Sequence, residues 1–400
     1  MDRDSEKYKK SKPNSQNIVI FIGFMICMIV MGASDSMRGV FGGVFQEHFS
    51  LTTTQVSTIV TVSYIGNLVF LLLGGNILDR FEKKKVFLSV VGIWMCGATV
   101  FVATDNYMML LIGMFLCMGA STLINTTINL LVPLVFAGAP SLIVNVLFFT
   151  QGIGTSTSQN LVGRYAEDIS AWHLVNVVLL VIIAIGIVAV CFSKLPNPKT
   201  EKQQVSYRRI IKHPAFLYLI LIFGFYFIAE HGILNWFLAY CTSELGMNNE
   251  SAAVYLSMFF GGMTIGRLVF APVVQKLGVL KSIMLFGGVS TVIYSIGIAG
   301  GKHTVVLLSM TGCMLSIVYP TLVLMIQKYY EKDCIATATG VIISIATIFD
   351  IVFNMLFGVI TDIIGIRFAF YVLLMSMIMF YVVFLFFRRN VAPREEVDAL

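Results

Sequence analysis

The sequence has little charge, little proline and none of the short motifs that carry common enzymatic chemistry. Only 12% of its 400 residues are charged and nine are proline, whereas 58% are hydrophobic. It contains no H-E-x-x-H, Walker A, G-x-S-x-G or C-x-x-C motif. We therefore expect no enzyme, no metal site and no cofactor. The composition also excludes an ordinary soluble domain.

Long hydrophobic stretches are what the sequence has instead. A helix needs roughly 20 apolar residues to cross a hydrocarbon core of ~30 Å. Twelve stretches satisfy this, near residues 18–40, 54–77, 86–104, 107–134, 142–163, 172–193, 215–240, 252–274, 282–301, 304–327, 335–360 and 368–387. The sequence thus predicts an all-α polytopic membrane protein with 12 transmembrane helices.

The positive charges predict how these helices are oriented. If the N-terminus is cytoplasmic, 22 of the 27 Lys and Arg residues lie in cytoplasmic loops and tails, and three lie on the opposite side. This bias follows the positive-inside rule, so both termini are predicted to be cytoplasmic, in the cell membrane. The net charge of +6 then reflects topology, and no nucleic-acid partner is implied. The first stretch lacks a cleavage site and is predicted to remain as a helix.

The longest polar connection divides the predicted helices into six and six. At an offset of 196 residues, Gly66 falls on Gly262, Arg80 on Lys276 and Lys85 on Lys281. These matches favour two pseudo-symmetric six-helix halves, although chance matching in a glycine-rich chain is the alternative. The predicted domains are a cytoplasmic tail 1–17, a bundle 18–193, a linker 194–214, a bundle 215–387 and a tail 388–400.

Between the second and third predicted helices, the segment 75–85 reads GNILDRFEKKK, an acid among bases. It resembles the G-x-x-x-D-R-x-G-R-[KR]-x signature of the major facilitator superfamily, with Glu82 where that family usually has glycine. The resemblance implies a secondary transporter with the major facilitator fold. It also implies a conformational latch on the cytoplasmic side, formed by Gly75, Asp79, Arg80, Lys84 and Arg267. The alternative is that these charges only set topology.

The segment 32–39 of the first helix, GASDSMRG, is similar to the fucose permease group of proton-coupled sugar symporters. That group uses an acid in the first helix and a glutamate in the fourth. Asp35 matches the acid and Asn125 also fits, but Ser121 or Thr122 stands at the glutamate position. The resemblance therefore implies a sugar-like cargo and proton coupling, without implying fucose itself.

Ionisable residues inside the predicted helices are candidates for function, because such groups cost several kcal/mol unless they face partners or water. Under the repeat offset Asp35 aligns with His231, which places ionisable groups at one depth in both halves. We predict that Asp35 and Glu230 handle the coupling proton. Local alternatives are an ion pair of Asp35 with Arg38 and a hydrogen bond of His231 with Asn235.

Polar and aromatic side chains at helical spacing complete the predicted cargo site. Buried amides that only hold helices together and aromatic residues of the core are the structural alternatives. The predicted substrate-binding residues are Arg38, Asn125, Asn129, Gln151, Gln159, Tyr226, His231, Asn235, Trp236, Tyr319, Asp350 and Asn354.

These features predict a secondary active transporter that moves a small neutral polar solute by alternating access. The cargo is expected to be neutral because both arginines inside the helices have structural partners, leaving no cation to hold an anion. The alternative is a proton-coupled exporter of lipophilic cations, and a channel or a sensor is the rival from other classes. The expected partners are the cargo, the proton and the lipid bilayer. The sequence does not decide the oligomeric state and is compatible with a monomer.

Overall fold

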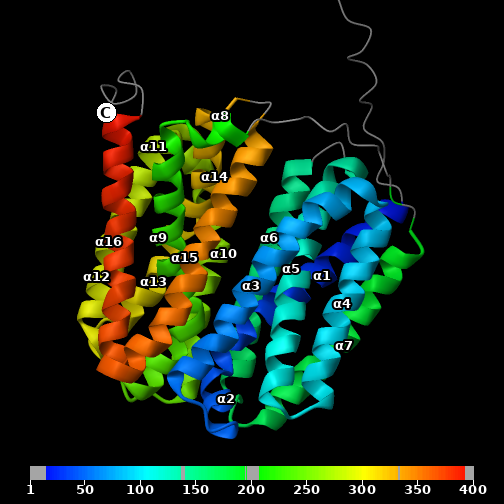
Figure 1. Ribbon diagram of the computed structural model, residues 1–400, viewed down its shortest axis with the longest axis horizontal. Helices are drawn as coiled ribbons and strands as arrows, with labels where there is room; N and C mark the ends of the chain where they lie inside the picture. The colour runs from blue at the N-terminus through cyan, green and yellow to red at the C-terminus, as the bar shows by residue number, and fades with distance from the viewer. Residues whose placement is uncertain (1–14, 137–139, 194, 196–206, 332–333, 392–400) are drawn as a thin grey trace, which may run out of the picture. The chain divides into compact units, whose positions relative to one another are not determined.

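A computed structural model describes residues 15–136, 140–193, 195, 207–331 and 334–391, and within these ranges every regular element is helical (Figure 1). The side chains of Gly75, Asp79 and Arg80 lie outside the described part, although their backbone belongs to a helix. The prediction of an all-α protein is confirmed.

Twelve long helical segments occur in the described residues, close to the predicted positions. Their bounds are α1 Ser15–Val40, α3 Thr53–Arg80, α4 Lys83–Ala103, α5 Tyr107–Val135, α6 Pro140–Gly163, α7 Ile169–Cys191, α9 Ala215–Ser243, α10 Asn249–Leu277, α11 Val279–Ser282 continued through the π-helical η1 Ile283–Gly287 into α12 Gly288–Ala299, α13 Val305–Leu315 followed by α14 Val318–Tyr329, α15 Ile335–Ile364 and α16 Ile366–Asn390. The short helices α2 Gly42–His48, α8 Tyr207–Ile211 and η2 Gly301–His303 were not predicted.

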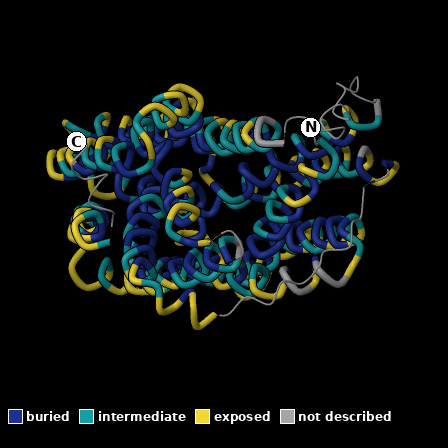
Figure 2. Tube along the Cα trace, turned by 90° about the horizontal axis from the view of Figure 1, so that it is seen from above, coloured by how far each residue is buried: buried dark blue, intermediate teal, exposed yellow. Residues whose placement is uncertain are grey.

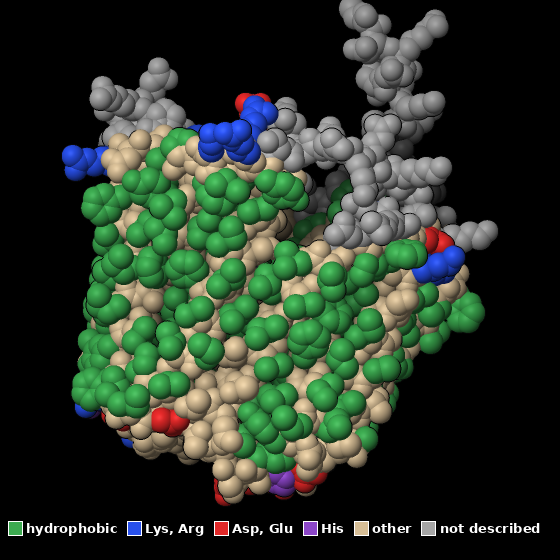
Figure 3. Space-filling view, viewed as in Figure 1, with side chains coloured by type: hydrophobic (Ala, Val, Ile, Leu, Met, Phe, Trp, Pro, Cys, Tyr) green, Lys and Arg blue, Asp and Glu red, His purple; other side chains and the backbone are tan. Residues whose placement is uncertain are grey.

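The surfaces of these helices suit a bilayer. In the described part, 11 segments are long and apolar enough to cross a membrane, and the more polar α6 is not among them. On α7 the exposed side chains Leu174, Val178, Val181, Ile185 and Val188 recur every three or four residues, which makes one apolar face. Figure 3 shows hydrophobic side chains over the sides of the helices and charged ones near their ends. The chain is therefore a multi-pass membrane protein.

The chain forms two compact units, each with its own buried interior. Unit 1 contains the described residues of 1–35, 65–155 and 170–200, and unit 2 contains those of 36–64, 156–169 and 201–400. Figure 2 shows buried positions along the inner sides of the helices and exposed positions along their outer sides. Because residues 36–64 and 156–169 belong to unit 2, the units do not coincide with the two halves of the sequence. The predicted domain bounds stay a prediction.

Glycines allow two helices of unit 1 to approach at backbone distance. A Cβ atom on Gly32 of α1 would meet the carbonyl oxygen of Gln151 on α6, and a Cβ on Gly154 of α6 would meet that of Ile29 on α1. The Thr155 hydroxyl also donates a hydrogen bond of 3.0 Å to the Gly32 carbonyl. Small residues in contact are how helices pack closely inside membranes.

The N-terminus of α3 has an unusually complete set of hydrogen-bond acceptors. Thr52 and Gln55 form a reciprocal capping box, with Thr52 N–H donating to Gln55 Oε1 at 2.9 Å and Gln55 N–H to Thr52 Oγ1 at 3.2 Å. The next free amides, of Thr53 and Thr54, donate to Asp362 of α15 at 3.1 and 2.8 Å, and Thr54 Oγ1 donates to it at 2.6 Å. Asp362 therefore ties α15 to the start of α3 within unit 2.

Candidate transport site

Unit 2 holds a cluster of polar side chains from four helices, α1, α3, α9 and α15. Phe227, His231 and Asn235 are spaced four residues apart on α9, so they share one face, and Asp350 and Asn354 are spaced in the same way on α15. These two faces pack against each other, and Arg38 of α1 and Tyr64 of α3 join them. We call the residues Arg38, Tyr64, His231, Asn235, Trp236, Asp350 and Asn354 the polar cluster.

His231 and Asp350 are the closest ionisable neighbours in the cluster. His231 Nδ1 lies 2.7 Å from Asp350 Oδ2, while Asp350 is only 1% exposed and the His231 side chain is 25% exposed. The imidazole ring stacks on Tyr64, with centroids 5.5 Å apart, and on Phe227, with centroids 5.3 Å apart. The other oxygen of Asp350, Oδ1, is buried and has no hydrogen-bond partner among the described residues.

Arg38 is buried and joins the cluster through neutral acceptors. Its Nε donates to Asn235 Oδ1 at 2.8 Å and its Nη2 donates to the Tyr64 hydroxyl at 3.1 Å. Because Arg38 cannot accept a hydrogen bond, the contact fixes the orientation of the Asn235 amide. Asn235 Nδ2 then donates to the Tyr64 hydroxyl at 3.2 Å. The guanidinium carbon also lies 4.7 Å from the centroid of the Tyr64 ring, a cation–π contact.

Asn354 extends the cluster along α15. Its Oδ1 accepts from the Trp236 indole N–H at 2.9 Å, and its Nδ2 donates to the Asp350 carbonyl at 2.8 Å. The Trp236 ring stacks on Phe357 with centroids 4.6 Å apart. Buried amide and indole groups are thus paired, as burial in a low-dielectric interior demands.

Gly39 allows α1 to approach α9 closely enough for Arg38 to contact it. A Cβ atom at this position would collide with the carbonyl oxygen of Leu234, so only glycine allows α1 and α9 to come this close. Arg38, which precedes Gly39 on α1, is then within hydrogen-bonding distance of Asn235, which follows Leu234 on α9. Glycine is therefore required at position 39, the last residue of the segment 32–39, because α1 crosses α9 there.

The cluster borders a cavity of about 310 Å³. Arg38, Asn235 and Trp236 line it together with polar side chains such as Gln46 and Thr242. This volume is at the lower end of the range typical of small-molecule sites. The cavity can therefore admit a small polar solute up to the guanidinium of Arg38.

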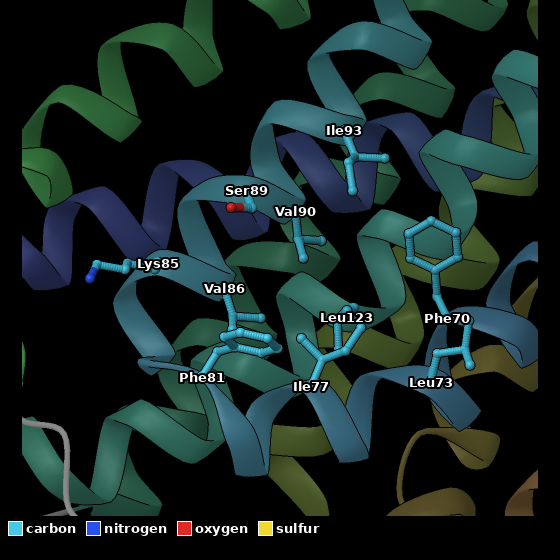
Figure 4. A pocket seen from close by; sticks show the side chains of 10 residues that line it. All are labelled: Phe70, Leu73, Ile77, Phe81, Lys85, Val86, Ser89, Val90, Ile93 and Leu123. Atoms are coloured by element: carbon cyan, nitrogen blue, oxygen red, sulfur yellow. The ribbon is translucent and has the colours of Figure 1, made fainter.

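A second cavity, of about 370 Å³, lies in unit 1 and differs in chemistry. Figure 4 shows mainly apolar side chains around it, among them Phe70, Ile77, Phe81 and Leu123, while Lys85 points away from this group. Phe81 is 61% exposed. Such a wall offers almost no hydrogen bonds, so it does not fit a polar solute.

Several predicted site residues belong to unit 1 and lie outside the polar cluster. Asp35 Oδ2 accepts a hydrogen bond of 2.9 Å from Ser121 Oγ on α5. Asn125 and Asn129 follow Ser121 on the same face of α5, and the side-chain oxygen of each is buried without a hydrogen-bond partner in the described part. Gln151, on α6, is half-buried. The predicted cargo residues are thus divided between the two units.

The remaining predicted site residues belong to unit 2 but lie outside the polar cluster. Tyr226 stacks on Tyr319 with centroids 6.5 Å apart, and Phe227 lies 6.0 Å from Tyr319 and connects both to His231. Glu230 is half-buried on α9. Gln159 of α6 is fully buried, and its amide has no hydrogen-bond partner among the residues described.

The predicted latch is described only in part. Lys84 donates to the carbonyls of Cys191 and Ser193, at 2.7 and 2.6 Å, where α7 ends. Such a cation satisfies free carbonyls at a helix C-terminus. Arg267 Nε lies 3.4 Å from the Ser316 carbonyl, near the break between α13 and α14. The side chains of Gly75, Asp79 and Arg80 lie outside the described residues, so the latch stays a prediction.

Tyr64 is the main residue of the polar cluster outside the predicted substrate-binding set, although its flat ring with a polar edge made it one of several tyrosines suited to stacking. It is one of several tyrosines in the predicted helices, and nothing in its local sequence separates it from a packing residue. Tyr64 lies 26 residues after Arg38 on a different helix, so helical periodicity does not predict that the two side chains are in contact. The alternative of a hydrogen bond between His231 and Asn235 does not match the contacts in the structure. His231 contacts Asp350, whereas Asn235 contacts Arg38 and Tyr64.

Helices of membrane-spanning length that enclose buried ionisable groups define a polytopic membrane transport protein. Within that class the chain belongs to the major facilitator superfamily, because residues 24–349 match the family described as Major Facilitator Superfamily. The predicted resemblance to this family is confirmed.

Known proteins agree at the level of the fold. A solved nucleoside transporter superposes with a TM-score of 0.76 at 12% identity, covering 92% of this chain and 99% of its own. The fucose:proton symporter of E. coli superposes with a TM-score of 0.66 at 16% identity, covering 93% and 99%. In sequence, the cis,cis-muconate transport protein of Acinetobacter baylyi is 21% identical over 295 residues, 69% of this chain and 70% of that protein.

Proposed function

We propose that this transporter takes up a small neutral polar solute, sugar-like in its hydrogen-bonding groups, by proton-coupled symport. It would work in the cell membrane with both termini in the cytoplasm, the two bundles 18–193 and 215–387 moving against each other. The observation that carries the proposal is the polar cluster, which joins residues of α1 and α3 to residues of α9 and α15 beside a small cavity.

The groups at this cavity suit hydroxyl-rich cargo. Asn235 and Asn354 present amides, Trp236 presents an indole N–H, and Tyr64 presents a hydroxyl on a flat ring. Amides and hydroxyls bind neutral polyols by exchanging hydrogen bonds, and aromatic faces pack on their C–H surfaces. The cargo would replace some hydrogen bonds within the cluster and so separate the helices that it now connects.

Asp35 and Glu230 are our candidates for proton coupling in this scheme, one in each unit. Asp35 is hydrogen-bonded to Ser121, in the helix where the fucose permease group has its glutamate. A carboxyl whose hydration changes between states binds a proton in one and releases it in the other. Lys84 and Arg267, with Gly75, Asp79 and Arg80, are proposed to stabilise one of these states.

One observation favours a second candidate cargo, a small carboxylate. Arg38 lines the cavity, where its guanidinium contacts Asn235 and Tyr64. A guanidinium is the side chain best suited to bind a carboxylate with two parallel hydrogen bonds. The relative from Acinetobacter baylyi is described as a transporter of cis,cis-muconate, a dicarboxylate.

A binding screen separates these possibilities. Purified protein is heated with D-xylose, L-fucose, uridine, cis,cis-muconate or ethidium, and the unfolding temperature is recorded. The sugar-like proposal expects stabilisation by a neutral compound and accumulation of that compound in proteoliposomes under an inward proton gradient. Stabilisation by muconate or by ethidium alone would replace it with the carboxylate or the lipophilic-cation hypothesis.

Matched variants show whether binding occurs at the polar cluster. Asn235→Ala should abolish the stabilisation, because this amide contacts Arg38 and Tyr64. Asn390→Ala is the control, since Asn390 is exposed and donates a hydrogen bond to the Tyr218 hydroxyl at the C-terminal end of α16, outside the polar cluster. Equal loss in both variants would mean that the cargo binds elsewhere or that the effect is general.

A further inference from the structure

The His231–Asp350 pair has a geometry that the proposed cargo site does not require. We infer that this pair is a further proton-binding site that acts together with Asp35 and Glu230, and that Arg38 and Tyr64 make its occupancy depend on whether the helices carrying them are in contact. This inference rests on the proposed function. It assigns a proton site to two residues that the sequence placed only with cargo binding.

Asp350 cannot easily hold an uncompensated charge where it lies. It is 1% exposed, one oxygen is 2.7 Å from His231 Nδ1, and the other oxygen is buried without a hydrogen-bond partner among the described residues. A buried carboxylate oxygen that lacks a donor costs desolvation free energy. A proton shared by the pair, either on the imidazole or on the carboxyl, reduces this cost.

His231 gives the pair access to protons. Tyr64 and Phe227 stack on the ring and Asp350 holds one ring nitrogen, yet a quarter of the side chain is exposed. Asp350 itself is shielded on all sides. Protons can therefore reach the carboxylate through the imidazole, which is the side chain best suited to accept and pass a proton near neutral pH.

The charged and titratable groups that face His231 come from four helices. They are Asp350 on α15, Tyr64 on α3, Arg38 on α1 and Glu230 on α9 itself. Burial of the ring disfavours a protonated imidazole, the two acids favour one, and the Arg38 guanidinium repels one. Arg38 and His231 also contact the same Tyr64 ring, at 4.7 and 5.5 Å.

This arrangement links the proton to conformation. When the imidazole is neutral, Arg38 can remain against Tyr64 and Asn235 and hold α1 and α3 to α9. When it is protonated, two cations border one ring in a low-dielectric interior, and their repulsion opposes the contact. By linkage, separation of α1 and α3 from α9 favours proton uptake, and proton release favours contact.

The first test needs no cargo. In a cysteine-free background, a cysteine replaces Ala239, which lines the cavity beside the cluster. Its labelling rate by a maleimide is measured in detergent at pH 5.5 and pH 8. Each rate is normalised to that of a cysteine at the exposed Glu167, so the pH dependence of thiol reactivity cancels. We expect normalised labelling to be at least fivefold faster at pH 5.5.

Variants of the pair should remove this pH dependence. His231→Gln keeps a hydrogen-bonding group next to Asp350 but cannot hold the proton, and Asp350→Asn removes the acid. Each should make the normalised rates at the two pH values equal within a factor of two. Arg38→Gln should do the same, because the repulsion is gone. Persistence of the full pH effect in His231→Gln would overturn the inference, whether or not Asp350→Asn folds.

A transport assay then distinguishes this inference from the proposed function. Proteoliposomes are tested for accumulation of D-xylose and uridine driven by a pH gradient, and for exchange of each compound at equal pH. His231→Gln should lose accumulation driven by the pH gradient to a greater extent than exchange at equal pH, because exchange requires no net movement of protons. Full accumulation by His231→Gln refutes the proton role while leaving symport intact. A wild type that switches with pH yet accumulates neither compound refutes their symport and leaves the pair as a proton site.

Discussion

The contact of Asp362 with the start of α3 gives the sharpest prediction about how unit 2 opens. Asp362→Ala removes three hydrogen bonds, from Thr53 N–H, Thr54 N–H and Thr54 Oγ1. Acceptors at helix N-termini contribute about 0.5–2 kcal/mol, and exposure of Asp362 places its contribution in the middle of this range. A loss of about 1–2 kcal/mol corresponds to a shift of roughly 5- to 30-fold in the equilibrium between contact and separation of α3 and α15.

The labelling rate of a cysteine at Ala239 reports this shift. This residue lines the same cavity as Thr53, so separation of α3 and α15 exposes it. At constant pH, Asp362→Ala should raise the rate by roughly 5- to 30-fold. Glu167→Ala, at an exposed acid of the same unit, is the control and should leave it unchanged. A rate within twofold of the parent in Asp362→Ala would mean that this cap does not hold the helices together.

Three further outcomes are expected. Gly39→Val should cost about 1–3 kcal/mol of stability because its side chain collides with α9, while Gly43→Val, where the added Cβ meets nothing within 4 Å, should cost much less; thermal unfolding measures both. Asn354→Leu leaves the buried Trp236 indole N–H without its acceptor and should cost about 1–3 kcal/mol, of which Trp236→Phe in the same background should restore a part. Burial lowers the pKa of His213, so its stabilising contribution is present above roughly pH 6.5 and is lost as pH falls towards the folded-state pKa; the protection factors of the amides in residues 207–216, which correct exchange rates for the intrinsic effect of pH, should fall at pH 5 in the wild type and not in His213→Phe.

Hydrophobicity predicted the helices well because each crossing must be apolar over a length set by the bilayer. The ends were predicted less well. Gly278 and Gly365, both with positive φ, each form the single residue between two helices. The helices on either side therefore continue up to the glycine, several residues beyond the apolar stretches that were predicted. The π-helical segment Ile283–Gly287 and the break at Ser316–Ile317 leave no trace in hydrophobicity, since they alter hydrogen bonding within an equally apolar run.

Periodicity predicted which residues of the polar cluster share a helix face, but it did not predict which side chains on different helices contact each other. The spacing of Asp350 and Asn354 predicted a common face on α15, and the structure has it. Which helix that face meets depends on packing between segments more than 100 residues apart, which a single sequence does not encode locally. The repeat offset aligned Asp35 with His231, yet Asp35 bonds to Ser121 of α5 whereas His231 bonds to α15. Sequence symmetry thus gives corresponding positions without giving corresponding partners.

The close packing of α1 and α6 has a consequence for how the chain enters the membrane. Polar residues such as Gln151, Thr155 and Gln159 reduce the free energy that α6 gains by partitioning into hydrocarbon by itself. Gly154 and Gly32 let α1, made earlier, approach α6 at backbone distance and cover part of that polar face. We therefore expect α6 to insert more readily when α1 is already in the membrane, so that the order of synthesis affects the folding pathway.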